Sequence, residues 1–92
     1  MEDIQKLRKR IDEIDEQILR LLGERAETCR SIGLLKKEQG MPIIDTSREN
    51  EVYAKIRVKA TDFSLDPDQT EVVYRQIVNM CSSVQASKEK SE

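Results

Sequence analysis

The chain has 92 residues, of which 16 are Lys or Arg and 18 are Asp or Glu, so the formal net charge is only −2. This balance, with 3% aromatic residues, argues against nucleic-acid binding, which needs an excess of cations and often aromatic stacking platforms. The longest uncharged apolar run is about four residues, far below the roughly 20 of a membrane helix, and the N-terminus lacks the apolar core of a signal peptide. We therefore expect a soluble, cytoplasmic protein with a single domain over residues 1–92.

The residue types also limit the chemistry. Histidine is absent, and Cys29 and Cys81 are the only cysteines, too few for a metal cluster. We expect no cofactor, no metal and no redox chemistry. Without the usual general base near neutral pH, catalysis would have to use carboxylates, Lys, Arg, amides or positioning alone.

The first predicted element is a long amphipathic helix from about Asp3 to Gln39. At 1.5 Å per residue it would be roughly 55 Å long, whereas a compact chain of this length has a diameter of only about 30 Å. One chain cannot cover such a helix, so we expect an intertwined homodimer whose long helices pack along their apolar seams. The seam follows alternating steps of three and four residues and consists of Ile4, Leu7, Ile11, Ile14, Ile18, Leu21, Ile32 and Leu35.

A second, shorter helix is predicted after a loop. Gly40 offers a left-handed cap for the first helix, and Pro42 disfavours helical geometry in the residue before it. Thr46 and Glu49 match a capping box at the start of a helix of about fifteen residues. Its apolar face consists of Val52, Tyr53, Ile56 and Ala60.

A third helix completes an all-α fold of three helices per chain. Asp66 suits its N-cap and Pro67 its first helical position. Residues 87–92 are polar and are expected to form a frayed tail. The inward face of the third helix is predicted to consist of Val73, Tyr74, Ile77, Val78, Cys81 and Val84.

Two polar residues interrupt the apolar seam. Steps of four and three from Leu21 lead to Arg25 and Thr28 before the seam resumes. A guanidinium keeps its charge, and burying it without a partner costs several kcal/mol. The ordinary explanations are an ion pair with a carboxylate of another helix or a polar group that sets the register of a coiled coil. The alternative is an anion-binding site.

Lys36 supports the anion site. It lies eleven residues after Arg25 (36 − 25), which at 100° per residue places both cations within about 20° on one helix face. Arg8 lies about 100° around the helix from Arg25 and more than four turns away, so the two cannot meet at one small ligand within a chain. In a dimer, the partner subunit's Arg8 could meet Arg25 at one small ligand. Taken alone, Arg8 would be an ordinary surface residue.

Other candidate site residues have ordinary structural explanations when each is taken alone. Asp45 and Glu49 at a helix N-terminus would satisfy free amides and the helix dipole. Alternatively, Glu49 accepts a hydrogen bond from a ligand hydroxyl and Arg48 helps to bind a carboxylate. On the third helix, Cys81 would fill the core and Gln85 would be exposed near the helix end.

An ordered series of motifs runs without a gap through about residues 4 to 86. The series consists of Leu7-Arg8-x-x-Ile11-Asp12-x-Ile14-Asp15, Leu21-Leu22-x-Glu24-Arg25, Ile32-Gly33-x-x-Lys36, Pro42-x-x-Asp45-x-x-Arg48-Glu49 and Gln85. A single motif of this set is weak, but the whole series at these separations is specific. It resembles the all-helical class of chorismate mutases, in their free-standing, monofunctional type.

This resemblance implies a domain-swapped homodimer with two equivalent active sites, each completed by an arginine of the other chain. Arg25 and the partner subunit's Arg8 resemble the clamps for the carboxylates of chorismate, which is a dianion. Lys36 resembles the cation that reaches a carboxylate and the ether oxygen, and Gln85 resembles the amide at that same oxygen.

The resemblance also implies secondary substrate contacts. Arg48 resembles a further pocket arginine, and Glu49 with the backbone at Asp45 resembles the group that holds the ring hydroxyl. Cys81 occupies a substrate-contact position at which some relatives have a small hydroxyl residue. Two further residues would form the pocket wall, namely Thr28 and Ile32.

The implied reaction suits a chain without histidine. The conversion of chorismate to prephenate, a step of phenylalanine and tyrosine biosynthesis, is an intramolecular [3,3] rearrangement that transfers no proton. The catalyst has to hold a reactive conformer and stabilise negative charge on the ether oxygen. Two alternatives stay open at this level: a non-enzymatic helical dimerisation module, and elimination of pyruvate from isochorismate on the same scaffold.

Overall fold

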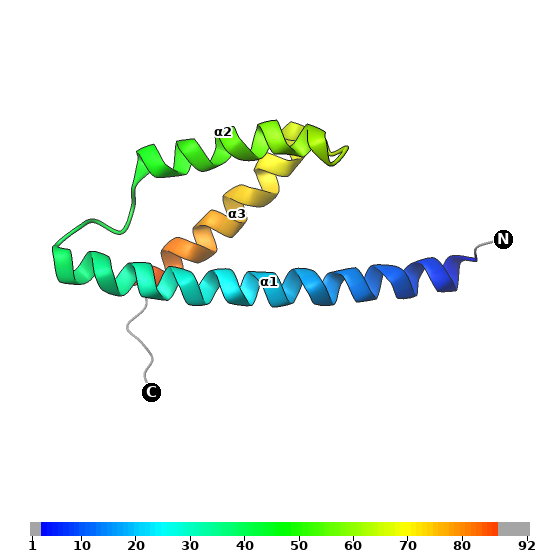
Figure 1. The fold of residues 1–92 in the computed structure, drawn as a ribbon, viewed down its shortest axis with the longest axis horizontal. Coiled ribbons are helices and arrows are strands. Elements are labelled where there is room, and N and C mark those ends of the chain that lie inside the picture. The colour runs from blue at the N-terminus through cyan, green and yellow to red at the C-terminus, as the bar shows by residue number, and fades with distance from the viewer. Residues whose placement is uncertain (1–2, 87–92) are drawn as a thin grey trace.

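Three helices make up the computed structural model, which describes residues 3–86 (Figure 1). They are α1 (Ile4–Gln39), α2 (Thr46–Asp62) and α3 (Pro67–Ala86), and residues 3–86 contain no strand. The predicted all-α class and the order of one long and two shorter helices are confirmed. The frayed tail predicted for residues 87–92 lies outside the described residues.

Local sequence signals set both ends of α1. The carboxylate of Asp3 caps the N-terminus by accepting a hydrogen bond from the backbone N–H of Lys6 at 2.9 Å. Gly40 ends the helix with φ 67°, in the left-handed region that favours glycine. The helix therefore has the predicted end and begins one residue after the predicted start, because Asp3 is its cap.

The cap of α2 differs from the prediction. The N-cap is Asp45, whose carboxylate accepts a hydrogen bond from the N–H of Arg48 at 3.0 Å. The capping box predicted for Thr46 and Glu49 is wrong, because Thr46 is already the first helical residue. A charged carboxylate is a stronger acceptor for a free amide than a hydroxyl, and the side chain of Glu49 lines a cavity instead.

The start of α3 matches the prediction, but part of its inward face does not. Asp66 accepts hydrogen bonds from the N–H groups of Asp68 and Gln69 at 2.8 and 3.1 Å, directly before Pro67. Val73 is 57% exposed in the protomer, so its predicted inward position is wrong. It lies five residues before the buried Val78, which places it about 140° around the helix.

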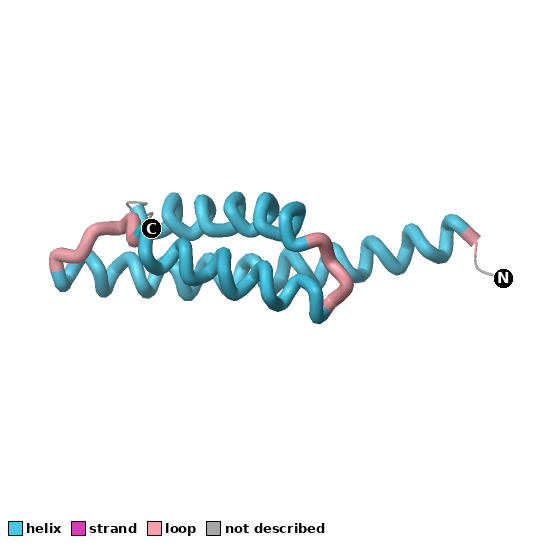
Figure 2. The backbone as a smooth tube through the Cα atoms, turned by 90° about the horizontal axis from the view of Figure 1, so that it is seen from above, coloured by secondary structure: helices cyan, strands magenta, loops and turns pink. Residues whose placement is uncertain are grey.

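The third helix holds the protomer together. Figure 1 shows α3 crossing between α1 and α2, and it packs against both. The small apolar core lies along these contacts and consists of Cys29, Tyr53, Ala60 and Val78. The N-terminal end of α1 extends beyond the other two helices (Figure 2).

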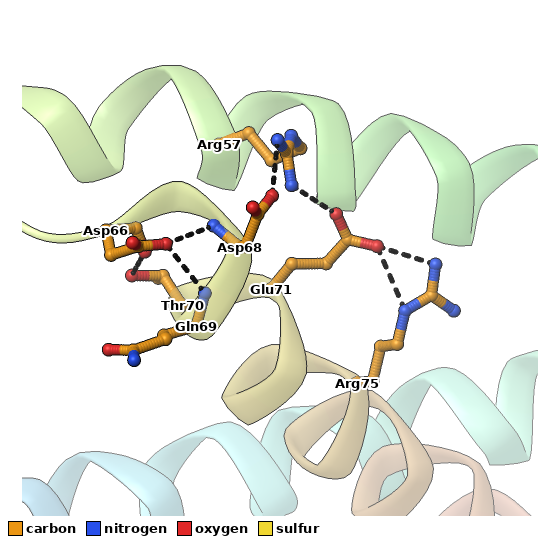
Figure 3. Close-up of polar contacts among 7 residues, drawn as sticks. All are labelled: Arg57, Asp66, Asp68, Gln69, Thr70, Glu71 and Arg75. Carbon is orange, nitrogen blue, oxygen red and sulfur yellow. Dashed lines mark hydrogen bonds and ion pairs between the residues drawn. The ribbon is translucent and has the colours of Figure 1, made fainter.

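A polar network also joins α2 to α3 (Figure 3). Arg57 of α2 forms ion pairs with Asp68 at 2.8 Å and with Glu71 at 2.9 Å. Glu71 also accepts hydrogen bonds from Arg75 at 2.6 and 3.0 Å, and the Arg75 guanidinium lies 4.3 Å from the centre of the Tyr53 ring. Hydrogen bonds from Arg75 first, and then from Arg57, hold the pKa of Glu71 below its ordinary value.

The protomer is elongated, and most of the predicted seam is exposed. Its longest dimension is 58 Å and its radius of gyration is 16.5 Å, against about 12 Å for a compact chain of this length. None of the described helices combines the length and the apolar character needed to cross a membrane. The large seam residues that stay exposed in the protomer are Ile4, Leu7, Ile11, Ile18, Leu21, Ile32 and Leu35.

Candidate functional site

A cavity of about 370 Å³ lies between the C-terminal half of α1, the start of α2 and the C-terminal half of α3. Its volume falls in the range of small-molecule sites. All but one of the predicted site residues line it, and Thr28 and Ile32 contribute to its wall as predicted. The predicted site residues in its lining are Arg25, Lys36, Asp45, Arg48, Glu49, Cys81 and Gln85.

Lys36 is fixed at the cavity wall by hydrogen bonds. Its ammonium donates to the carbonyl oxygen of Ile43 at 2.7 Å and to Oε1 of Gln85 at 2.8 Å. An ammonium has three donors, so one remains for a ligand. The contact with Ile43 was not predicted, because it depends on the path of the loop between α1 and α2.

Gly33 explains how Gln85 reaches Lys36. A Cβ atom at Gly33 would lie 2.8 Å from Cα and 3.0 Å from Cβ of Gln85. The glycine thus allows α1 and α3 to approach so closely that Gln85 faces the lysine one turn further along α1. Gly33 belongs to the motif that precedes Lys36, but the sequence alone does not show what it contacts.

Arg25 is half-buried and lines the same cavity. Within residues 3–86, none of the ion pairs includes Arg25 or Lys36. The intrachain ion pair that would explain Arg25 as a structural residue is therefore not found in this part of the chain. Two cations on one helix face line a cavity, as the anion-site interpretation predicts.

The two cysteines form a disulfide between α1 and α3. Cys29 and Cys81 are 52 residues apart in sequence, and their Cα atoms lie 5.5 Å from each other. Cys81 is therefore more than core filler, because it links α3 to α1 covalently. Two cysteines on different helices carry no sequence signal of their pairing, which depends on how the helices pack. Cys81 Sγ also accepts a hydrogen bond from Nε2 of Gln85 at 3.0 Å.

The start of α2 brings three charged residues to the cavity. Asp45 and Glu49 line it, and Glu49 is half-buried. Arg48 also lines it, but its guanidinium forms an ion pair with Glu51 at 2.6 Å, and both side chains are well exposed. Within residues 3–86, no group of three or more Cys, Asp or Glu side chains is placed to hold a metal ion.

Arg8 is the one predicted site residue that is absent from the cavity lining. It is exposed on the N-terminal half of α1. Arg8 and Arg25 are separated by 17 residues (25 − 8), or about 25 Å along the helix. The cavity of one protomer therefore does not include its own Arg8.

Comparisons with known proteins identify the family of this chain. The family model of chorismate mutase type II matches residues 7–86. A chorismate mutase from Methanocaldococcus jannaschii is 36% identical over 66 residues, which cover 72% of this chain and 67% of that protein. A bifunctional chorismate mutase/prephenate dehydratase from Aquifex aeolicus is 41% identical over 88 residues, 92% of this chain. The match spans only 24% of that bifunctional relative's length.

Solved structures show the same fold. The chorismate mutase (form II) from Thermus thermophilus superposes with a TM-score of 0.89 at 29% identity, over 97% of this chain and all of that one. A conserved hypothetical protein from Pyrococcus furiosus has a TM-score of 0.69 at 35% identity, over 89% of this chain and 93% of that one. The chain belongs to the type II chorismate mutase family.

Proposed function

We propose that this chain is a chorismate mutase, an isomerase that converts chorismate to prephenate by an intramolecular [3,3] rearrangement. The observation that carries the proposal is the pair of Lys36 and Gln85, joined at 2.8 Å in the wall of a cavity that Arg25 also lines. Family membership supports the same activity.

The cations suit a dianionic substrate. Arg25 has no intrachain ion pair among the described residues, and its planar guanidinium can bind a carboxylate with two hydrogen bonds. Lys36 has one N–H left for the substrate, and its compact charge suits an oxygen that becomes negative as the C–O bond breaks. These groups position the substrate and stabilise the transition state without taking a proton.

Gln85 supplies the second donor at the ether oxygen. Because Lys36 holds its amide oxygen, Nε2 is the end that can donate. That group now donates to Cys81 Sγ, a weak acceptor, at 3.0 Å. The amide NH₂ has two donors, so its second N–H is available to the ether oxygen while the first stays on the sulfur.

Residues of α2 complete the site in this proposal. Glu49 and the backbone at Asp45 hold the ring hydroxyl, which fits a half-buried carboxylate in the cavity lining. Arg48 assists with a carboxylate once it leaves its exposed ion pair with Glu51. Such exposed pairs contribute little free energy, so the exchange costs little.

The proposed active enzyme is a homodimer, with Arg8 donated across the interface. The exposed seam of α1 supports a second copy, because monomeric proteins rarely expose apolar surface of this extent. The partner subunit's Arg8 would then clamp the second carboxylate. We also propose a cytoplasmic location and a role in aromatic amino-acid biosynthesis, in line with the family.

The test of the function is to mix purified protein with chorismate and, in a separate reaction, with isochorismate, and to follow the ultraviolet absorbance and the products. Prephenate as the product supports the proposal. Pyruvate released from isochorismate would assign the chain to the elimination reaction. No consumption of either compound at high protein concentration would favour a dimerisation module and overturn the proposal.

A further inference from the structure

The disulfide between Cys29 and Cys81 lies in the wall of the proposed active site. Cys29 is only 3% exposed, whereas Cys81 is half-buried, and both line the cavity. The bond therefore has one sulfur anchored in the core on α1 and one on α3 beside the cavity. Thiol–disulfide exchange needs access to a sulfur, and the Cys81 side provides it.

The disulfide contacts the proposed catalytic amide. Gln85 lies one turn after Cys81 on α3, and its Nε2 donates to Cys81 Sγ at 3.0 Å while its Oε1 accepts from Lys36 at 2.8 Å. Cys29 Sγ in turn lies 3.9 Å from a terminal nitrogen of Arg25. A continuous set of contacts thus links the bond to all three residues assigned to catalysis.

We propose that Cys81 is a positioning residue for Gln85 and that its bond to Cys29 sets the rate of turnover, the disulfide form being the more active one. This inference rests on the proposed function. In the disulfide form, the bond holds the C-terminal turn of α3 against α1 and keeps the sulfur that orients Nε2 in place. Two separate thiols need more room than a bonded pair. Because Cys29 is enclosed in the core, Cys81 has to move, and it moves against Gln85.

Reduction of the disulfide by a small dithiol is an ordinary thiol–disulfide exchange. A thiolate of the dithiol attacks Cys81 Sγ, the sulfur–sulfur bond breaks, and Cys29 leaves as a thiolate that takes a proton. The second thiol of the reagent, as its thiolate, then attacks the reagent sulfur that is bonded to Cys81. Cys81 is released as a thiolate and also takes a proton. The protein gains two electrons and two protons, and the reagent becomes a cyclic disulfide.

A cytoplasmic location gives this chemistry a use. Disulfides of cytoplasmic proteins are usually transient and act in catalysis or redox sensing. A bond in the wall of the active site would couple prephenate formation to the thiol pool of that compartment.

The test measures kcat and KM of the parent before and after dithiothreitol, and counts thiols by mass after alkylation. We expect two alkyl groups only after reduction, and a fall in kcat of about 10-fold to 100-fold, since misplacing a catalytic group by about 1 Å can cost this much. KM should change by less than about threefold, because Gln85 acts mainly in the transition state. Reoxidation should restore kcat, and Cys29→Ser, which cannot form the bond, should not respond to the reagent.

Two further measurements separate positioning from a purely structural crosslink. Cys81→Ser keeps an acceptor for Nε2 and Cys81→Ala does not, so the serine variant should have the higher kcat, although both lack the bond. The side-chain amide signal of Gln85 in a nitrogen–proton correlation spectrum, assigned from its loss in Gln85→Glu, should shift when the parent is reduced and stay unchanged in Cys29→Ser.

The outcomes are distinct. A parent that carries two free thiols and cannot be oxidised overturns the inference. So does complete reduction that changes neither kcat nor the Gln85 signal, or equal kcat for the two Cys81 variants. If no form consumes chorismate but the Gln85 signal shifts on reduction, the proposed function fails while the positioning of Gln85 stands. If no form consumes chorismate and the signal does not shift, both fail.

Discussion

The backbones of α1 and α3 lie close together at a residue without a side chain, Gly33. In Gly33→Ala, the new Cβ would lie 2.8 Å from the backbone Cα of Gln85, so the helices must separate. We expect the free energy of unfolding to fall by about 1–3 kcal/mol, as for other overpacked sites. Turnover should fall as well, since Gln85 moves away from Lys36.

The matched control is Gly23→Ala on the same helix. Nothing lies within 4 Å of a Cβ at that position, so the helix should gain about 0.5–1 kcal/mol from the better helix former. Urea denaturation of the two variants measures both effects. Equal changes in the two variants would contradict the role given to Gly33.

Gln85 makes a prediction about pH. Its amide donates a hydrogen bond at any pH, whereas Gln85→Glu places a carboxylate beside Lys36, where it neutralises the cation and cannot donate. The variant should lose about 100-fold or more in kcat at pH 7 and recover only in acid, below the ordinary glutamate pKa, because Lys36 favours the ionised carboxylate. A pH–rate profile parallel to that of the parent would show that Gln85 does not act at the ether oxygen.

For single residues, the sequence predicted the placement of those that helix geometry alone fixes. Arg25 and Lys36 share a helix face because an α-helix turns by 100° per residue. The carbonyl of Ile43 at Lys36 and the bond between Cys29 and Cys81 depend instead on a loop path and on helix packing. No local pattern encodes those contacts.

The sequence predicted a helix end correctly where a single residue gives the capping signal. Gly40 ends α1 because only glycine enters the left-handed region at little cost. At the start of α2, by contrast, Asp45 and Thr46 are adjacent and both are good caps. The sequence could not choose between them, and the competing capping box gave the wrong prediction.

The ion-pair network between α2 and α3 makes stability depend on pH (Figure 3). Arg75 and Arg57 lower the pKa of Glu71 from its ordinary value of 4.5. The ionised carboxylate therefore adds stability that is fully present above pH 4.5 and is lost as the pH falls through the lowered pKa. Glu71→Gln should be less stable than the parent near pH 7, and the two melting temperatures should converge in acid.

A control for that variant is Glu13→Gln, which also removes one negative charge. Among residues 3–86, Glu13 pairs with the nearby Arg10 alone, on the exposed surface of α1 at 3.3 Å, and such pairs contribute little. Its melting curve should stay close to that of the parent across the same pH range. A Glu71→Gln difference that persists unchanged in acid would show that the charge is not the cause.

The overall shape of the molecule is determined by α1, which extends beyond the other two helices. Ile11 on the exposed seam is 55% exposed in the protomer, and burying one isoleucine contributes about 1.5–3 kcal/mol. A symmetric interface contains the position twice, so Ile11→Lys should weaken the dimer by about 100-fold or more. Glu16→Gln, which changes the charge equally on the opposite face, should have little effect.

Sedimentation velocity over a range of concentrations measures both variants. The parent should sediment as a dimer of twice the 10.7 kDa chain mass, and Ile11→Lys should dissociate and lose activity as Arg8 leaves the site. A parent that stays monomeric yet converts chorismate would refute the shared site. The sequence predicted this extended shape through helix length alone, but it could not give the crossing of α3 between α1 and α2, which depends on contacts distant in sequence.

The central claim is that Lys36, held by Gln85 and the Ile43 carbonyl, stabilises the charge that develops on the substrate. The most direct measurement compares chorismate turnover by Lys36→Met with that by Lys37→Met, its neighbour in the last turn of α1. We predict a loss of about 100-fold to 1000-fold in kcat for Lys36→Met and little change for Lys37→Met. Equal activity of the two variants would contradict the account.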